Sequence, residues 1–242
     1  MRISSKLFVI FLMTLGLSAR AQNPEKATEL IEASEKAMGG REAFNKIRHL
    51  NWNFFGARVL TWDKYTGDVR IDFQKENSVY LFNINTPGGK FLKEGVEVTD
   101  PTEKVELYKK GREIWINDSY WLIMPWKMKD EGVTTIYLGQ KNSPLDELSD
   151  VIEMTFAPTV GVTPDNKYLV YLNPETHLVS AWSYFPSQED AAPRFTMPWL
   201  DYIEYEGVLI SANRGERKLS PVHVYSKLSK KIYTTFDKPK IF

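Results

Sequence analysis

Val69-Arg70-Ile71-Asp72-Phe73 alternates apolar and charged side chains, which is the pattern of a β-strand that turns one face toward a core. The same two-residue period recurs from Leu50 onward in short segments separated by turn residues such as Pro87-Gly88-Gly89. Strands that follow one another through such turns pair antiparallel. The chain is therefore expected to be dominated by antiparallel β-sheet.

Further strands are expected at 51–60, 78–84, 105–108, 113–116, 120–124, 133–138, 151–156, 168–172, 177–185, 202–205, 208–212 and 232–236. The segments 120–124 and 168–172 have no polar side, so both of their faces need a cover of helix, loop or ligand.

Two helices are expected before the strands. Asn23 and Pro24 form a helix start, and apolar residues then recur at helical spacing over 24–38 until Gly39-Gly40. A shorter helix follows at 41–47. With no linker or repeat in the sequence, residues 22–242 are expected to form one domain. Two architectures stay open: a β-sandwich with an N-terminal helix, or a curved sheet whose concave side the helix fills.

The N-terminus has the pattern of a cleaved signal peptide, predicted at residues 1–21. Basic Arg2 and Lys6 precede an apolar run at 7–17, and Ala19-Arg20-Ala21 offers a cleavage site. The run is shorter than the ~20 residues that span a bilayer. The chain has no cysteine, which excludes disulfides, thiolate catalysis and a lipoprotein anchor at Gln22. A periplasmic or secreted protein is expected.

Charge and motifs exclude several classes of function. The chain has 31 basic and 31 acidic residues, and removal of Arg2, Lys6 and Arg20 makes it slightly acidic, which argues against nucleic-acid binding. The sequence contains no G-x-S-x-G, H-E-x-x-H, P-loop or G-x-G-x-x-G motif. No catalytic residue, metal ligand or cofactor is therefore assigned, and the acidic residues at 146–153 are interpreted as a solvated face after a helix start at Ser143-Pro144.

The segment at 120–132 is the most distinctive in the chain. An apolar run passes into a proline-broken loop that keeps large apolar side chains, where loops are normally polar. One interpretation is a loop that packs over the core. The other is the wall or mouth of an apolar cavity, because methionine adapts to varied apolar ligands. The candidate ligand-binding residues are Trp121, Met124, Trp126 and Met128.

Four stretches together resemble the secreted LolA/LolB-like proteins of Bacteroidota. They are Ala37-Met38-Gly39-Gly40-Arg41-Glu42-Ala43-Phe44, the segment from Tyr120 to Asp130, Gly161-Val162-Thr163-Pro164-Asp165, and Tyr171-Leu172-Asn173-Pro174-Glu175-Thr176. The resemblance implies an α+β fold, mostly antiparallel: a curved, unclosed β-barrel with the N-terminal helices packed in its concave side. The family is similar in fold to carriers of outer-membrane lipoproteins, but no residue role is transferred from it.

These observations favour a protein without catalysis that binds an apolar small molecule, a lipid, an acyl chain or an acylated protein. Transient contact with the outer membrane is compatible with that role. Two alternatives stay open: an envelope interaction or structural module whose cavity is filled by its own side chains, and a hydrolase with an unrecognised site. A polar cluster inside the cavity would favour the hydrolase.

Overall fold

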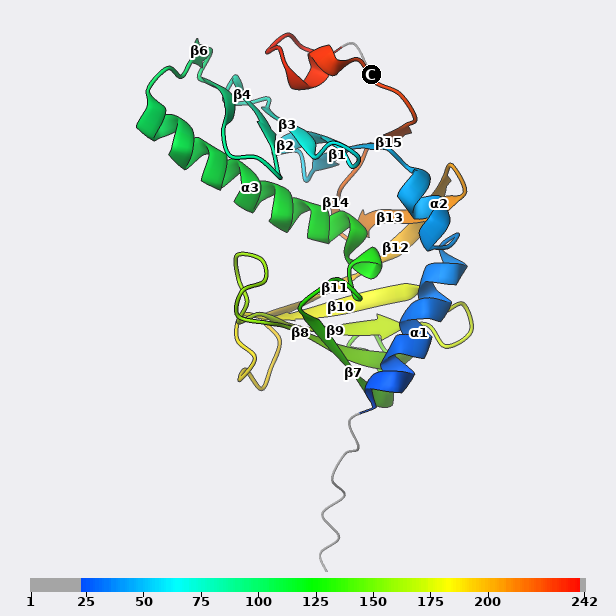
Figure 1. Ribbon diagram of the computed structural model, residues 1–242. Coiled ribbons are helices and arrows are strands. Elements are labelled where there is room, and N and C mark those ends of the chain that lie inside the picture. Colours follow the sequence, from blue (N-terminus) through cyan, green and yellow to red (C-terminus); the bar gives the residue numbers. More distant parts are fainter. Residues whose placement is uncertain (1–22, 240–242) are drawn as a thin grey trace, which may run out of the picture.

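A computed structural model describes residues 23–239, which form three antiparallel sheets with three α-helices (Figure 1). The predicted signal peptide at 1–21 lies outside the described residues. No helix in the described range is both long enough and apolar enough to span a bilayer.

The three sheets contain seven, five and three strands. The seven-stranded sheet has the order β15-β1-β2-β3-β4-β5-β6: β15 Val222–Tyr225, β1 His49–Phe54, β2 Arg58–Asp63, β3 Asp68–Phe73, β4 Ser78–Asn83, β5 Gly89–Lys93 and β6 Val96–Glu97. The five-stranded sheet has the order β11-β10-β9-β8-β7: β11 Phe195–Pro198, β10 Val179–Phe185, β9 Lys167–Leu172, β8 Leu148–Phe156 and β7 Val133–Asn142. The three-stranded sheet contains β12 Leu200–Tyr205, β13 Val208–Arg214 and β14 Arg217–Lys218.

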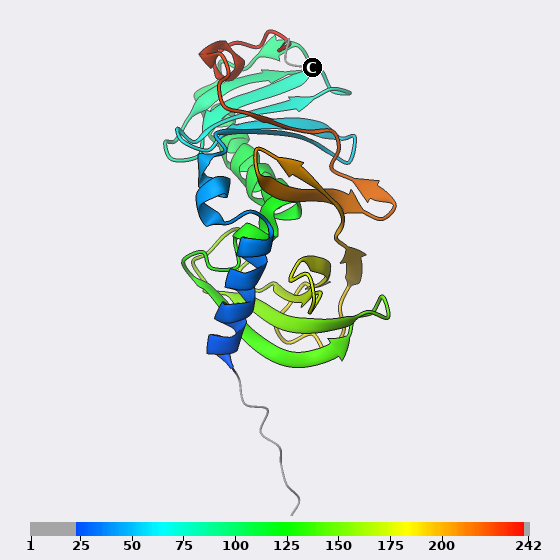
Figure 2. The ribbon, with the colours of Figure 1, turned by 90° about the vertical axis from the view of Figure 1, so that its right-hand side faces the viewer.

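The sheets curve around the helices and do not close into a barrel (Figure 2). Helix α1, Pro24–Ala37, packs its apolar side against the inner face of the five-stranded sheet, where Ala27, Leu30 and Ile31 join the core. Helix α2, Arg41–Lys46, buries Phe44 in the neighbouring core. The expected fold class, a mostly antiparallel curved sheet with helices on its concave side, is confirmed.

Helix α1 follows from local signals in the sequence. The Asn23 side chain accepts a hydrogen bond from the backbone N–H of Lys26 at 2.8 Å, which satisfies one of the free donors at the start of α1. Pro24 occupies the first turn, where its missing N–H costs nothing.

The longest helix contradicts the sequence interpretation. Residues Pro101–Ile123 form α3, a single helix of 23 residues, where strands had been expected at 105–108, 113–116 and 120–124. The start signal was present: the Asp100 side chain accepts from the backbone N–H of Glu103 at 2.8 Å, and Pro101 follows the cap. The all-apolar stretch at 120–124 is therefore a helix end buried on several sides, which periodicity does not distinguish from a buried strand.

Gly111 lies in the middle of α3, although glycine is unfavourable inside a helix. A Cβ at this position would lie 2.8 Å from a ring carbon of Phe82 on β4. The glycine therefore lets the helix approach the seven-stranded sheet closely, and its packing role outweighs its low helix propensity.

Other differences lie at the ends of the elements. The expected strand at 51–60 is split into β1 and β2 by a turn at Gly56, which has a positive φ of 72°. The expected strand at 232–236 is instead the short 3-10 helix η2, Lys230–Tyr233. Ser143-Pro144 does not start a helix but lies in the turn from β7 to β8. Strands β5, β6, β11, β14 and β15 were not anticipated.

Two apolar clusters make up most of the core. One lies between the seven-stranded sheet and α3 and contains Trp52, Ile71 and Leu122; the other lies between the five-stranded sheet and α1 and contains Ile31, Ile152 and Trp182. Trp121, near the end of α3, contacts both clusters. Figure 1 shows α3 running along the inner face of the seven-stranded sheet toward the five-stranded sheet.

Three arginines fix α3 and the short 3-10 helix η1, Met124–Trp126, that follows it. Arg58 on β2 makes a bidentate ion pair with Asp118 of α3, with N–O distances of 2.6 and 2.7 Å. Arg214 on β13 donates to the carbonyl oxygen of Trp121 at 2.6 Å, and Arg41 donates to that of Trp126 at 2.7 Å. Arginines from three separate elements therefore hold this segment between the sheets.

Replacement of Ile31 by Ala should lower the free energy of unfolding by about 2–5 kcal/mol, because the side chain is fully buried against the five-stranded sheet. Denaturant unfolding measures the change. Glu29→Ala, at an exposed position of the same helix, should stay within about 0.5 kcal/mol of the wild type. A loss below that value for Ile31→Ala would mean that α1 is peripheral to the fold.

Asp118→Ala should destabilise the protein by about 3–5 kcal/mol, because it leaves the guanidinium of Arg58 without its buried partner. The double variant Arg58→Met/Asp118→Leu removes both charges and should recover a large part of that loss in the same unfolding experiment. If Asp118→Ala unfolds at the wild-type denaturant concentration, the ion pair does not hold α3 on β2.

Candidate functional site

A cavity of about 440 Å³ lies between the C-terminal half of α3 and the inner face of the five-stranded sheet. Its volume falls in the range of about 300–1,000 Å³ that is usual for small-molecule sites. The aromatic lining residues are Trp115, Tyr120, Trp121, Phe156, Tyr168, Trp182, Tyr184 and Phe195.

Strand register assembles the aromatic wall. Tyr184 on β10 is paired directly with Tyr168 on β9 and with Phe195 on β11. The ring centroids of these two pairs are 5.4 and 5.1 Å apart. Cross-strand neighbours on one face of a sheet contact each other. The three strands therefore present a continuous row of rings to the cavity.

Two large indoles extend this row. Trp182, two positions before Tyr184 on β10, stacks on Tyr168 with centroids 5.0 Å apart and ring planes at 5°. Trp121 of α3 meets Trp182 edge to face at 4.9 Å. Offset stacked and edge-to-face pairs are the favoured aromatic geometries. The wall is therefore a closely packed aromatic surface that joins the helix to the sheet.

Polar groups in the lining form a small network. The side-chain amide of Asn166 donates to the hydroxyl of Thr163 at 2.7 Å, and its oxygen accepts from the hydroxyl of Tyr184 at 3.3 Å. Burial raises the pKa of Tyr168 to about 12, so its phenol stays protonated at neutral pH. This network is neutral.

The charged lining residues follow η1. Lys127 forms an ion pair with Asp130, and its ammonium lies 5.6 Å from the ring centroid of Tyr120. Burial, with a smaller contribution from Asp130, raises the pKa of the Tyr120 phenol well above its usual range. The Lys127–Asp130 pair is partly exposed, so it is screened by solvent.

The structure separates the four residues that the sequence singled out. Trp121 lines the cavity. Met124, Trp126 and Met128 are fully buried and do not belong to its lining. The ring of Trp126 stacks on Phe44 of α2 with centroids 4.5 Å apart, and both methionines join the core beneath α1. The loop after α3 thus packs inward at these positions.

Sequence reasoning missed the strand residues of the wall. The available signal was the recurrence of aromatic residues on successive strands, with Trp182 and Tyr184 sharing one face of β10. Gly161, Val162 and Thr163, in the stretch that carried part of the family resemblance, also line the cavity. Among the described residues, no cluster of three or more His, Cys, Asp or Glu side chains is arranged to hold a metal ion.

No known family model matches the chain, and no curated protein matches it at the sequence level. Among solved structures, the chain is similar to a DUF1329 family protein from Desulfovibrio piger, with a TM-score of 0.48 and 9% identity over 87% of this chain and 97% of that chain. An outer membrane lipoprotein-sorting protein domain from Vibrio parahaemolyticus gives a TM-score of 0.44 and 9% identity over the same shares. A LolA superfamily protein from Nitrosomonas europaea gives 0.34 and 10% identity over 86% and 97%. The affiliation with Bacteroidota stays a prediction.

Trp126→Ala should cost about 3–5 kcal/mol of unfolding free energy, because only 2% of this residue is exposed and its ring stacks on Phe44. Affinity of the folded variant for an apolar probe should be unchanged, since the side chain does not reach the cavity. Chemical unfolding and a fluorescent fatty-acid titration measure the two quantities. If Trp126→Ala instead binds the probe more weakly and keeps wild-type stability, the interpretation of Trp126 as a residue of the cavity mouth would be correct.

Proposed function

We propose that this protein binds an apolar ligand, such as a lipid, an acyl chain or the lipid anchor of an acylated protein, without transforming it. The observation that carries the proposal is the open cavity of about 440 Å³ with its aromatic wall. Each buried methylene of an acyl chain contributes about 0.8 kcal/mol. A chain of moderate length would therefore bind usefully even after the entropic cost of ordering it.

The lining chemistry argues against the hydrolase alternative. The hydroxyl of Ser119 donates to the carbonyl oxygen of Ile116 within its own helix, so no base activates it. The Thr163 hydroxyl accepts from Asn166, and Lys127 is paired with Asp130. Nucleophilic catalysis needs a nucleophile within hydrogen-bond reach of a general base. The described lining residues include no histidine, and neither the Ser119 nor the Thr163 hydroxyl is hydrogen-bonded to a general base.

Cavity volume argues against the interaction-module alternative. That alternative requires the protein's own side chains to fill the concave space. The helices do fill part of it, with Ile31 and Leu122 buried in the core. The space beside Trp121 and Tyr168 nevertheless remains open with every described side chain in place. An aromatic-lined opening favours a separate ligand.

The proposed setting is the periplasm or the exterior of the cell. It rests on the leader pattern of basic residues, apolar run and Ala19-Arg20-Ala21. In that setting, a ligand with an apolar chain would be shielded from water, and transient contact with the outer membrane would allow its exchange.

Val162→Asp tests the cavity directly. Val162 lines the cavity from a loop and is 44% exposed, so its replacement should leave folding intact. Loss of one apolar contact and introduction of a charge should weaken binding of a fluorescent fatty acid about tenfold or more. Fluorescence titration gives the Kd.

Val96→Asp is the matched control, because Val96 is 69% exposed on β6 and lies outside the cavity lining. It should bind like the wild type. Equal affinities of the two variants, or no uptake of any fatty acid or phospholipid by the wild type, would refute the proposed function.

A further inference from the structure

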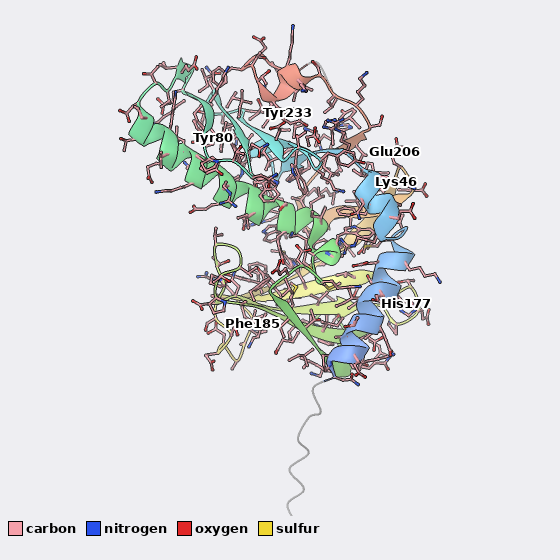
Figure 3. All side chains as sticks on the ribbon, in the orientation of Figure 1. Lys46, Tyr80, His177, Phe185, Glu206 and Tyr233 are labelled. Atoms are coloured by element: carbon pink, nitrogen blue, oxygen red, sulfur yellow. The ribbon has the colours of Figure 1, made fainter. Side chains whose placement is uncertain are left out.

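A second cavity, of about 660 Å³, lies on the opposite face of the seven-stranded sheet from α3. Strands β1 to β5 and the turn between β3 and β4 supply one side of it, and Phe236, Lys238 and Pro239 of the C-terminal segment supply the other. Figure 1 shows this segment crossing the outer face of the sheet, and Tyr233, labelled in Figure 3, lies in its short helix.

The C-terminal segment is held on this face by buried polar contacts. Arg70 of β3 is fully buried, and its Nη1 donates to the carbonyl oxygens of Ile232 at 3.1 Å and Thr235 at 2.8 Å. The Tyr233 hydroxyl lies 2.9 Å from Nδ1 of His49 on β1. The wall formed by this segment is therefore anchored to the strands.

The buried charge in this cavity is compensated within the protein. The Nε and Nη2 atoms of Arg70 donate to the carboxylate of Asp72 at distances of 2.7 to 3.0 Å. The guanidinium thus donates its hydrogen bonds to one carboxylate and to backbone carbonyl oxygens. Lys238 is exposed, so its ammonium is solvated. An anionic ligand would gain little from Arg70, and a cationic ligand little from Asp72.

The remaining polar lining is rich in side-chain amides. Asn51, Asn53, Gln74 and Asn77 all line the cavity. No hydrogen bond is formed by the side chains of Gln74 and Asn77 within residues 23–239, while Nδ2 of Asn51 donates to Leu60 and Thr61 and so orients that amide. The oxygen of the Asn53 amide accepts from the backbone N–H of Gly56 at 2.7 Å, so the amides of Gln74 and Asn77 are the ones that offer both donors and an acceptor to a ligand. Hydroxyl groups also donate and accept, so they match amides without a net charge.

The rest of the wall is apolar, with contributions from Phe73, Val79, Pro221 and Phe236. A ligand with a C–H face and a rim of hydroxyls can pack on these apolar side chains and form hydrogen bonds with the amides. We propose that this second cavity is a binding site for a neutral carbohydrate of the size of a mono- or disaccharide. The site is separate from the cavity beside α3 and does not depend on its function.

Isothermal calorimetry of the purified protein tests the site with neutral hexoses, N-acetylhexosamines and disaccharides, and with a hexose phosphate and a uronate as anionic counterparts. At least one neutral sugar should bind with a Kd of about 1 mM or tighter. The double variant Gln74→Leu/Asn77→Gly should weaken that binding roughly tenfold or more, because two amide contacts are lost. Both positions are exposed, and glycine tolerates the positive φ of 47° at Asn77.

Gln140→Leu is the matched control for Gln74→Leu. It replaces a glutamine by leucine at an exposed position of β7 that does not line the cavity. It should bind sugar like the wild type. The proposal is overturned if no neutral sugar binds, if only the anionic counterparts bind, or if the double variant and the wild type have equal affinities. Far-ultraviolet circular dichroism of each variant verifies that it is folded.

Discussion

The buried C-terminal end of α3 is the constraint on which the rest of the structure depends. The last turn of a helix leaves carbonyl oxygens without intrahelical partners, and water is excluded here because Leu122 and Ile123 are buried. Arg214 donates to the Trp121 carbonyl and lies over the ring of Trp199, 3.2 Å from its centroid. Burial lowers the pKa of Arg214 to about 9. Its hydrogen bonds to Ser211 and Asn213 offset part of that desolvation.

Fixing this helix end determines the geometry of the aromatic cavity. Gly111 sets the middle of α3 close to Phe82 of the seven-stranded sheet, while Arg214 holds the Trp121 backbone near the end of the helix. The Trp121 ring then reaches Trp182 and Phe195 of the five-stranded sheet. Because α3 packs tightly on the seven-stranded sheet, large aromatic rings fill the distance between α3 and the five-stranded sheet. The cavity is the space that these rings leave open.

The sequence correctly predicted those helices and strands that are determined by interactions between neighbouring residues. The cap at Asn23 and the alternation at 69–73 correctly identified α1 and β3, because each depends on neighbouring residues. Helix α3 was missed although the local signal for its start, the cap at Asp100 followed by Pro101, was present. Its last turn is apolar all round because it contacts the cores of both larger sheets, and such an apolar run also fits a buried strand. The same contacts place Trp126 and Met128 in the core and leave Trp121 at the cavity. The wall residues on β9 to β11 depend on strand register, which the sequence alone did not fix.

Strand β3 shows how one alternating pattern supports two different environments. Its apolar residues, such as Ile71, enter the core shared with α3, as the period of two requires. Read alone, that period also places Arg70 in solvent, yet the C-terminal segment covers it completely. A buried guanidinium is tolerated only when its donors are satisfied, and the carbonyls of Ile232 and Thr235 together with Asp72 satisfy them. The C-terminal segment is therefore required for the burial of Arg70 on the outer face of this sheet. Because Asp72 balances the charge of Arg70, the second cavity can contain both side chains without destabilising the fold.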